Sequence, residues 1–150
     1  MAEKNNSALF YTCSLIEYIG RYRKLRRGEV VSLLGEETIH RIYTHAGVLH
    51  CEPVAKVADD FVTMYSLPEG GYDNVASCRY TVPDYWTIGE VYERLIEDVC
   101  PGDDTNDIIR TLISVYTSWI DPEISNYNSD LFYQPRDYLR ECFLAVEIIE

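Results

Sequence analysis

The feature that most constrains the fold is the recurrence of apolar side chains at helical spacing. Apolar residues every three or four positions share one face of an α-helix, and that face must be buried against another element. Residues 88–99 keep this spacing over three turns. Similar patterns occur at 8–23, 28–34, 37–46, 53–65, 105–120 and from about 135 onward. We therefore expect a mainly α fold, a compact bundle of about seven helices.

The stretch between residues 66 and 85 interrupts the helical pattern. It contains the turn formers Pro68, Gly70, Gly71 and Asn74, and it leaves room for at most one small strand or hairpin near 75–82. We expect one domain over residues 1–150, because neither half alone has enough core. Its parts are an N-terminal helical half (1–66), a junction (67–85) and an acidic helical half (86–150). Thr87 and Glu90 fit a capping box for the helix that follows the junction.

Charge is distributed unevenly along the chain. The formal net charge is −12, and residues 76–150 carry fifteen acidic but only five basic side chains. A field of this sign repels phosphates and argues against direct nucleic-acid binding. It suits a basic protein partner, and it equally suits solubility alone. The five cysteines form no C-x-x-C pair, and no apolar run is long enough to span a membrane, so we expect a cytoplasmic protein with reduced thiols.

The acidic half supplies the first candidate site. Acidic side chains lie opposite the apolar stripe of 88–99 and continue into the loop that follows, where they can form an exposed acidic face. With one adjoining tyrosine, the candidate partner-binding residues are Tyr85, Glu90, Glu93, Glu97, Asp98, Asp103, Asp104 and Asp107. Tyrosine is typical of protein interfaces. Charged helix faces are also commonly only solvated.

Two other clusters suggest different functions. One contains all three histidines, His40, His45 and His50, followed by Cys51, and could line a pocket of an enzyme or small-ligand binder. Its spacing does not match known zinc patterns, so we expect no metal. The other is the basic run of Arg21, Arg23, Lys24, Arg26 and Arg27. It could bind nucleic acid in a regulator, or simply complement the end of the first helix.

No enzyme signature accompanies these clusters. The sequence has no P-loop, no G-x-G-x-x-G, no G-x-S-x-G and no zincin motif. We therefore assign no catalytic residue and no cofactor.

Residues 8–50 resemble a family of short, uncharacterised antitoxin-like proteins of Firmicutes. The resemblance rests on Leu9-Phe10-Tyr11, Ile16-Glu17-Tyr18, Gly28-Glu29-Val30-Val31-x-Leu33-Leu34, Ile39-x-x-Ile42-Tyr43 and Leu49-His50. Here Gly28 adjoins Glu29 directly, which departs from the family's spacing. Members are encoded beside toxin candidates of ADP-ribosyltransferase-like character, so the resemblance implies an antitoxin role and carries over no catalytic residue.

Charge and resemblance together give the leading hypothesis. We expect a non-enzymatic protein-binding inhibitor, antitoxin- or immunity-like, whose acidic face covers a basic site of a toxin or a nucleic-acid-binding protein. One form of this hypothesis is a DNA mimic. The ligand pocket near the histidines and the nucleic-acid regulator are the alternatives.

Overall fold

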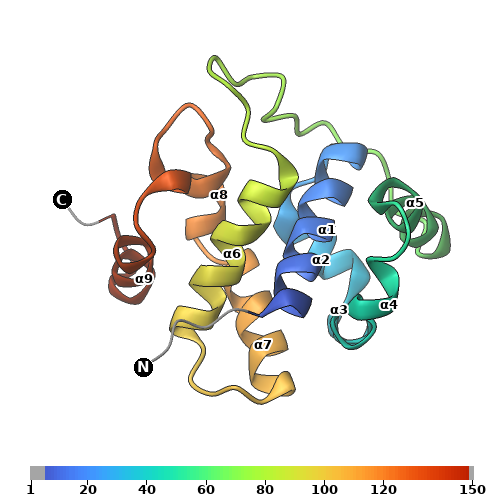
Figure 1. Ribbon diagram of the computed structural model, residues 1–150. Helices are drawn as coiled ribbons and strands as arrows, with labels where there is room; N and C mark the ends of the chain where they lie inside the picture. Colours follow the sequence, from blue (N-terminus) through green and yellow to red (C-terminus); the bar gives the residue numbers. More distant parts are fainter. Residues whose placement is uncertain (1–5, 149–150) are drawn as a thin grey trace.

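The computed structural model describes residues 6–148 and is mainly α, as the sequence predicted (Figure 1). Within this range it has nine α-helices, rather than about seven, and one short 3-10 helix. The elements are α1 (Ser7–Arg23), α2 (Arg27–Leu34), α3 (Glu36–Thr44), α4 (Ala46–Leu49), α5 (Val54–Met64), α6 (Tyr85–Val99), α7 (Thr105–Tyr116), α8 (Ile120–Ser125), η1 (Leu131–Tyr133) and α9 (Arg136–Ala145). None of these helices is both long enough and apolar enough to cross a membrane.

The junction contains no strand in the described range. Between α5 and α6 the chain forms turns, and the Asp73 carboxylate accepts a hydrogen bond from the Ala76 N–H at 2.9 Å. The small strand that the sequence allowed near 75–82 is therefore not formed. Gly35 ends α2 at a φ of 85°, a conformation that favours glycine.

Helix α1 lies at the centre of the fold. Figure 1 shows α6 on one side of it, α3 to α5 on the other, and α2 behind it. Ten of its residues are buried, and these include the polar side chains of Thr12, Ser14 and Glu17. The sequence pattern indicated a single apolar face, but neighbours on several sides bury most of the helix circumference.

A glycine allows α1 and α6 to approach closely. A Cβ atom added to Gly89 of α6 would lie 2.9 Å from both the backbone N and the Cα of Ser14 in α1. Only hydrogen fits in that space.

Helix α6 also begins earlier than predicted: Asp84 is its N-cap and accepts a hydrogen bond from the Thr87 N–H at 2.7 Å. The expected capping box at Thr87 and Glu90 is therefore wrong, because Asp84 fills that role.

Candidate functional site

One buried arginine and two buried carboxylates meet in the centre of the molecule. Arg27, the first residue of α2, is 4% exposed. Its guanidinium forms ion pairs with Glu17 of α1, through Nε, and with Asp121 of α8, at 2.9 Å from Nη1 to Oδ1. Both carboxylates are as deeply buried as the arginine. The three groups hold α1, α2 and α8 together.

Three hydroxyl groups complete the coordination of Arg27. Ser125 Oγ accepts from its Nη1 at 2.5 Å, and the Tyr92 hydroxyl accepts from the same nitrogen at 3.0 Å. The Tyr127 hydroxyl accepts from Nη2 at 2.6 Å. Each tyrosine then donates its own proton to a carboxylate: Tyr127 to Glu17 at 2.7 Å, and Tyr92 to the carboxylate of α8. Nη1 thus faces three acceptors with its two N–H groups, so at least one of these hydrogens is shared between acceptors.

Arg21 extends the network towards the surface. Its Nε is 2.6 Å from Glu17 Oε2, and its Nη2 donates to the Pro83 carbonyl at 2.6 Å. We call Glu17, Arg21, Arg27 and Asp121 the ionic cluster. Its two cations and two anions balance, so it adds nothing to the net charge of the protein.

The electrostatics of the ionic cluster favour a fixed protonation state. Burial raises the pKa of Glu17, but Arg27, Arg21 and the Tyr127 hydroxyl outweigh burial and hold that pKa below its usual value. Burial raises the pKa of Tyr127 to about 12, and it raises the pKa of Tyr92 well above its usual value. The carboxylate is therefore ionised and both tyrosines are protonated donors at neutral pH. These buried, paired groups support the core.

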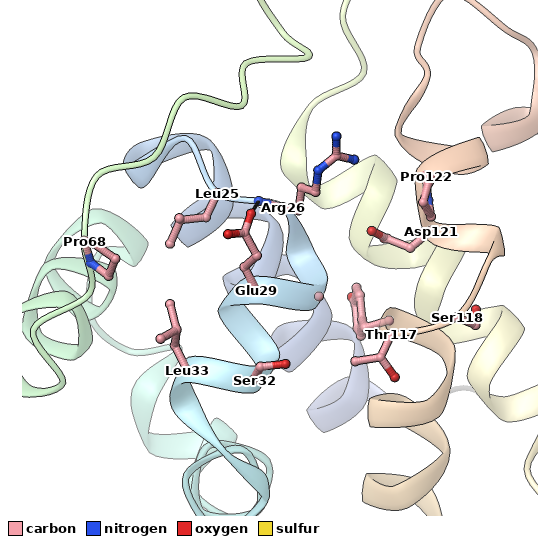
Figure 2. A pocket seen from close by; sticks show the side chains of 12 residues that line it. Leu25, Arg26, Glu29, Ser32, Leu33, Pro68, Thr117, Ser118, Asp121 and Pro122 are labelled. Atoms are coloured by element: carbon pink, nitrogen blue, oxygen red, sulfur yellow. Dashed lines mark hydrogen bonds between the residues drawn. The ribbon is translucent and has the colours of Figure 1, made fainter.

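An open groove lies directly beside the ionic cluster. It has a volume of about 600 Å³ and follows the outward face of α2, and Asp121 lines it as well as pairing with Arg27. Figure 2 shows side chains on both sides of α2, with Leu33 and Pro68 on one side and Pro122 on the other. We call this surface the α2 groove; its lining includes Leu25, Arg26, Glu29, Leu33, Pro68, Thr117 and Pro122.

Two charged residues form the edge of the α2 groove. The exposed carboxylate of Glu29 accepts a hydrogen bond from the Arg26 backbone N–H at 3.0 Å. The Arg26 guanidinium lies 4.4 Å from the centre of the Tyr72 ring, in a cation–π contact. Leu33 is 47% exposed, which is high for a leucine next to a core. The groove therefore offers apolar contact area with an acidic group at its edge.

The structure disperses the predicted acidic face. Glu93 and Glu97 were placed on the solvated side of their helix, and this is corrected: they are only 5% and 7% exposed. Both point into the packing between helices because α6 has neighbours on more than one side. Asp98 is half-buried and pairs with Arg136 of α9, which donates to its carboxylate from Nε and from Nη2 at 2.9 Å each.

The other residues of the predicted acidic face make separate local contacts. Glu90 lies 3.5 Å from Arg94, and Asp107 lies 3.9 Å from Arg110, so each has a nearby cation. Tyr85 is half-buried and packs edge-on against a tyrosine of α1. Two neighbouring residues, Asp103 and Asp104, remain exposed. The expected residues therefore do not form one continuous exposed surface.

The basic run does not form one exposed surface either. Arg27 is in the core and Arg21 points inward to the ionic cluster, so two of its five cations are already engaged. Arg23 is half-buried, and Lys24 and Arg26 are exposed. This corrects the expectation that residues 21–27 present their charges together, and it removes the central observation behind a nucleic-acid-binding regulator.

The histidine cluster is also divided. His45 Nδ1 lies 3.0 Å from the Arg41 carbonyl, and Cys51 contacts the Gly47 carbonyl. In the described part of the chain no three His, Cys, Asp or Glu side chains are placed to hold a metal ion. Of the three histidines, His50 lines a separate apolar hollow whose lining also includes Trp86.

Sequence reasoning missed the ionic cluster. The sequence signal for it was the position of Glu17, four residues after Cys13 and three before Gly20. This spacing places a carboxylate on a buried helix face, where it needs a cationic partner.

Comparison with known proteins gave no matching family model, curated protein or solved structure.

Proposed function

We propose that this chain is a non-enzymatic protein-binding protein that captures a basic, partly apolar segment of a protein partner in the α2 groove. The observation that carries the proposal is the combination of apolar walls and an acidic edge in an open groove of about 600 Å³. The resemblance of residues 8–50 to antitoxin-like proteins supports an inhibitory role for this binding.

The groove wall provides the contact area. Leu33 projects from α2 with nearly half of its surface exposed, and Leu25, Pro68 and Pro122 border the same hollow. Covering apolar surface of this kind stabilises a complex by roughly 25 cal/mol per Å² removed from water, before the costs of association. A partner segment with apolar side chains therefore gains from lying along α2.

Charge favours a basic partner over an acidic one. The chain has a net charge of −12, and Glu29 is exposed at the groove itself, whereas Arg26 beside it already contacts Tyr72. A negative field increases the encounter rate with a basic protein. The paired and buried carboxylates of α6 do not extend this charge as a row, so the DNA-mimic form has less support than direct coverage of a basic segment.

The ionic cluster holds the groove in shape. Arg27 begins α2 and Asp121 belongs to α8, and their ion pair joins two of the elements that border the groove. A binding surface that is already ordered before association loses less entropy when the partner arrives. The same core contacts that stabilise the fold therefore support binding.

Site-specific photo-crosslinking in the native cells tests this proposal. A benzoylphenylalanine replaces Leu33 in one variant and Met64 in the control; Met64 is 66% exposed on α5 and does not line the groove. We expect the Leu33 position to capture one protein with a net positive charge, and we expect higher salt to reduce this capture because exposed charges are screened within about 8 Å at physiological ionic strength.

Substitution by arginine provides the matching loss of function. Leu33→Arg places a cation in the groove and should abolish capture of the basic partner, whereas Met64→Arg should leave it unchanged. Both sites are exposed, so folding should be preserved in each. The proposal fails if Leu33 captures no protein beyond those captured at Met64. It fails also if the captured protein is acidic or if Leu33→Arg does not weaken its binding.

A further inference from the structure

The α2 groove contains a carboxylate oxygen that the ionic cluster leaves unused. Asp121 is 4% exposed, and Arg27 and Tyr92 both donate to its Oδ1 atom. Its other oxygen, Oδ2, accepts no hydrogen bond from the described residues, yet it is not sealed from solvent. A carboxylate oxygen without a donor, in a residue that is otherwise buried, keeps the capacity to accept from a ligand.

The groove makes this oxygen reachable from outside. Asp121 is one of the residues that line the hollow of about 600 Å³. Figure 2 shows its side chain extending from α8 into the space between α8 and α2. A long side chain of a bound segment can therefore approach Oδ2 while its neighbours lie along the apolar wall at Leu33 and Pro68.

The surroundings of this oxygen favour a cation. The exposed carboxylate of Glu29 borders the same groove. Helix α7 ends at Tyr116, which also lines the groove, and the carboxyl end of a helix has partial negative charge. Among the described lining residues Arg26 is the one cation, and its guanidinium lies 4.4 Å from the centre of the Tyr72 ring instead of pairing with Asp121.

These features fit arginine better than lysine. A guanidinium is less strongly hydrated than an ammonium group and presents a planar fork of N–H donors, so it loses less on entering a partly buried, carboxylate-lined hollow. We propose, on the basis of the proposed function, that the partner segment inserts an arginine side chain into the α2 groove, where its guanidinium donates to Asp121 Oδ2. Apolar residues on either side of this arginine contact Leu33 and Pro68.

A pair of capped peptides tests the arginine without altering the protein. Both consist of leucine and serine around one central position, which is arginine in the probe and citrulline in its twin. Citrulline has the shape of arginine and no charge. We expect the arginine peptide to shift the Gly28 backbone amide signal in two-dimensional NMR in a saturable manner, because Gly28 lines the groove. The citrulline peptide should bind about ten- to a hundred-fold more weakly, since it lacks charge-assisted hydrogen bonds.

The Asp121→Asn variant identifies the acceptor. Its amide oxygen can keep the contacts with Arg27 and Tyr92, which places the NH₂ group at the position of Oδ2, where it presents donors to the arginine. Affinity for the arginine peptide should fall about ten-fold or more, whereas the citrulline peptide should bind no less tightly. Asp103→Asn is the matched control, because it removes the same charge from an exposed residue that does not line the groove, and it should change neither affinity by more than about two-fold.

A direct measurement covers the case in which Asp121→Asn does not fold. In the wild-type protein the arginine peptide should shift the carboxyl ¹³C signal of Asp121, and the citrulline peptide should not. The inference is overturned if the two peptides bind equally, if the arginine peptide leaves this signal in place, or if its affinity survives Asp121→Asn. It is overturned also if free arginine amide binds as tightly as the peptide, because the groove would then bind a small cation and not a segment.

The outcomes separate this inference from the proposed function. Equal binding of both peptides that Leu33→Arg weakens would leave the α2 groove as a site for an apolar segment and remove the arginine from it. If neither peptide shifts the Gly28 signal, the arginine subsite is refuted, whereas capture at Leu33 in cells decides the proposed function independently.

Discussion

Replacing Arg27 by methionine tests the role of the ionic cluster most directly. Methionine is similar in length but removes the cation that faces Glu17 and Asp121 in the core. Asp121 then keeps one hydrogen bond, from Tyr92, while Glu17 still faces Arg21. The substitution therefore leaves buried negative charge that is only partly compensated.

The expected loss of stability is large. Arg27 and both carboxylates are buried, and removing one partner of a buried ion pair typically costs about 3–5 kcal/mol. That compares with a total unfolding free energy of about 5–15 kcal/mol for a typical protein. Arg94→Met is the matched control: its side chain is 43% exposed and lies 3.5 Å from Glu90, so its loss should be within about 0.5 kcal/mol.

The effect should also depend on pH. In the wild-type protein the pKa of Glu17 lies below its usual value, so its carboxylate contributes stability that is fully present above the unfolded pKa of about 4.3 and is lost as the pH falls through the folded pKa. In Arg27→Met the strongest opposing charge is gone, while burial still raises that pKa. The stability gap between the two proteins should therefore be widest near pH 7 and narrow towards pH 4.

Urea denaturation followed by far-UV circular dichroism, at pH 7 and pH 4.5, measures both effects. A loss below about 1 kcal/mol at pH 7, or a gap that does not change with pH, would refute the argument. If Arg27→Met is unfolded without urea, Tyr127→Phe provides a milder test. It removes one hydroxyl from the network and should cost about 1–3 kcal/mol.

Two further predictions concern packing and thiol reactivity. Gly89→Ala should lower the unfolding free energy by about 1–3 kcal/mol despite the better helix propensity of alanine, because its Cβ would meet the Ser14 backbone. Gly47→Ala, which has open space around it, should not lower the unfolding free energy, and thermal denaturation of both variants measures the difference. Iodoacetamide should modify exposed Cys51 first and Cys13 last, since burial raises the pKa of Cys13 to about 12; rapid native-state labelling of Cys13, mapped by mass spectrometry, would contradict this.

The helices were predictable because their apolar stripes are local. In 88–99 the buried residues Ile88, Tyr92, Leu95 and Ile96 follow the spacing that the sequence displays. The misplaced residues were Glu93 and Glu97, which share that helix. Carboxylates are almost never fully buried unless paired, so a sequence reading places them in solvent. Whether a second neighbour covers that side of the helix depends on contacts with distant segments, which local periodicity does not encode.

The ionic cluster shows the same limit more strongly. Glu17 and Arg27 are ten residues apart, but Asp121 is ninety-four residues from Arg27. Within the sequence Arg27 looks like one more cation in an exposed basic run, since nothing local indicates that an anion from α8 will face it. Pairing of this kind becomes visible only when the order of helices around α1 is known.

Charge therefore has two separate effects in this protein. The ionic cluster is balanced and buried, so it specifies which helix faces meet without contributing to the field that a partner experiences. That field comes from exposed carboxylates such as Asp103 and Asp104, which are distributed over the surface rather than gathered on one helix. A distributed field increases the rate of encounter but does not define a docking position. In the proposed function, the docking position comes from shape and apolar contact in the α2 groove, beside the helix that Arg27 anchors.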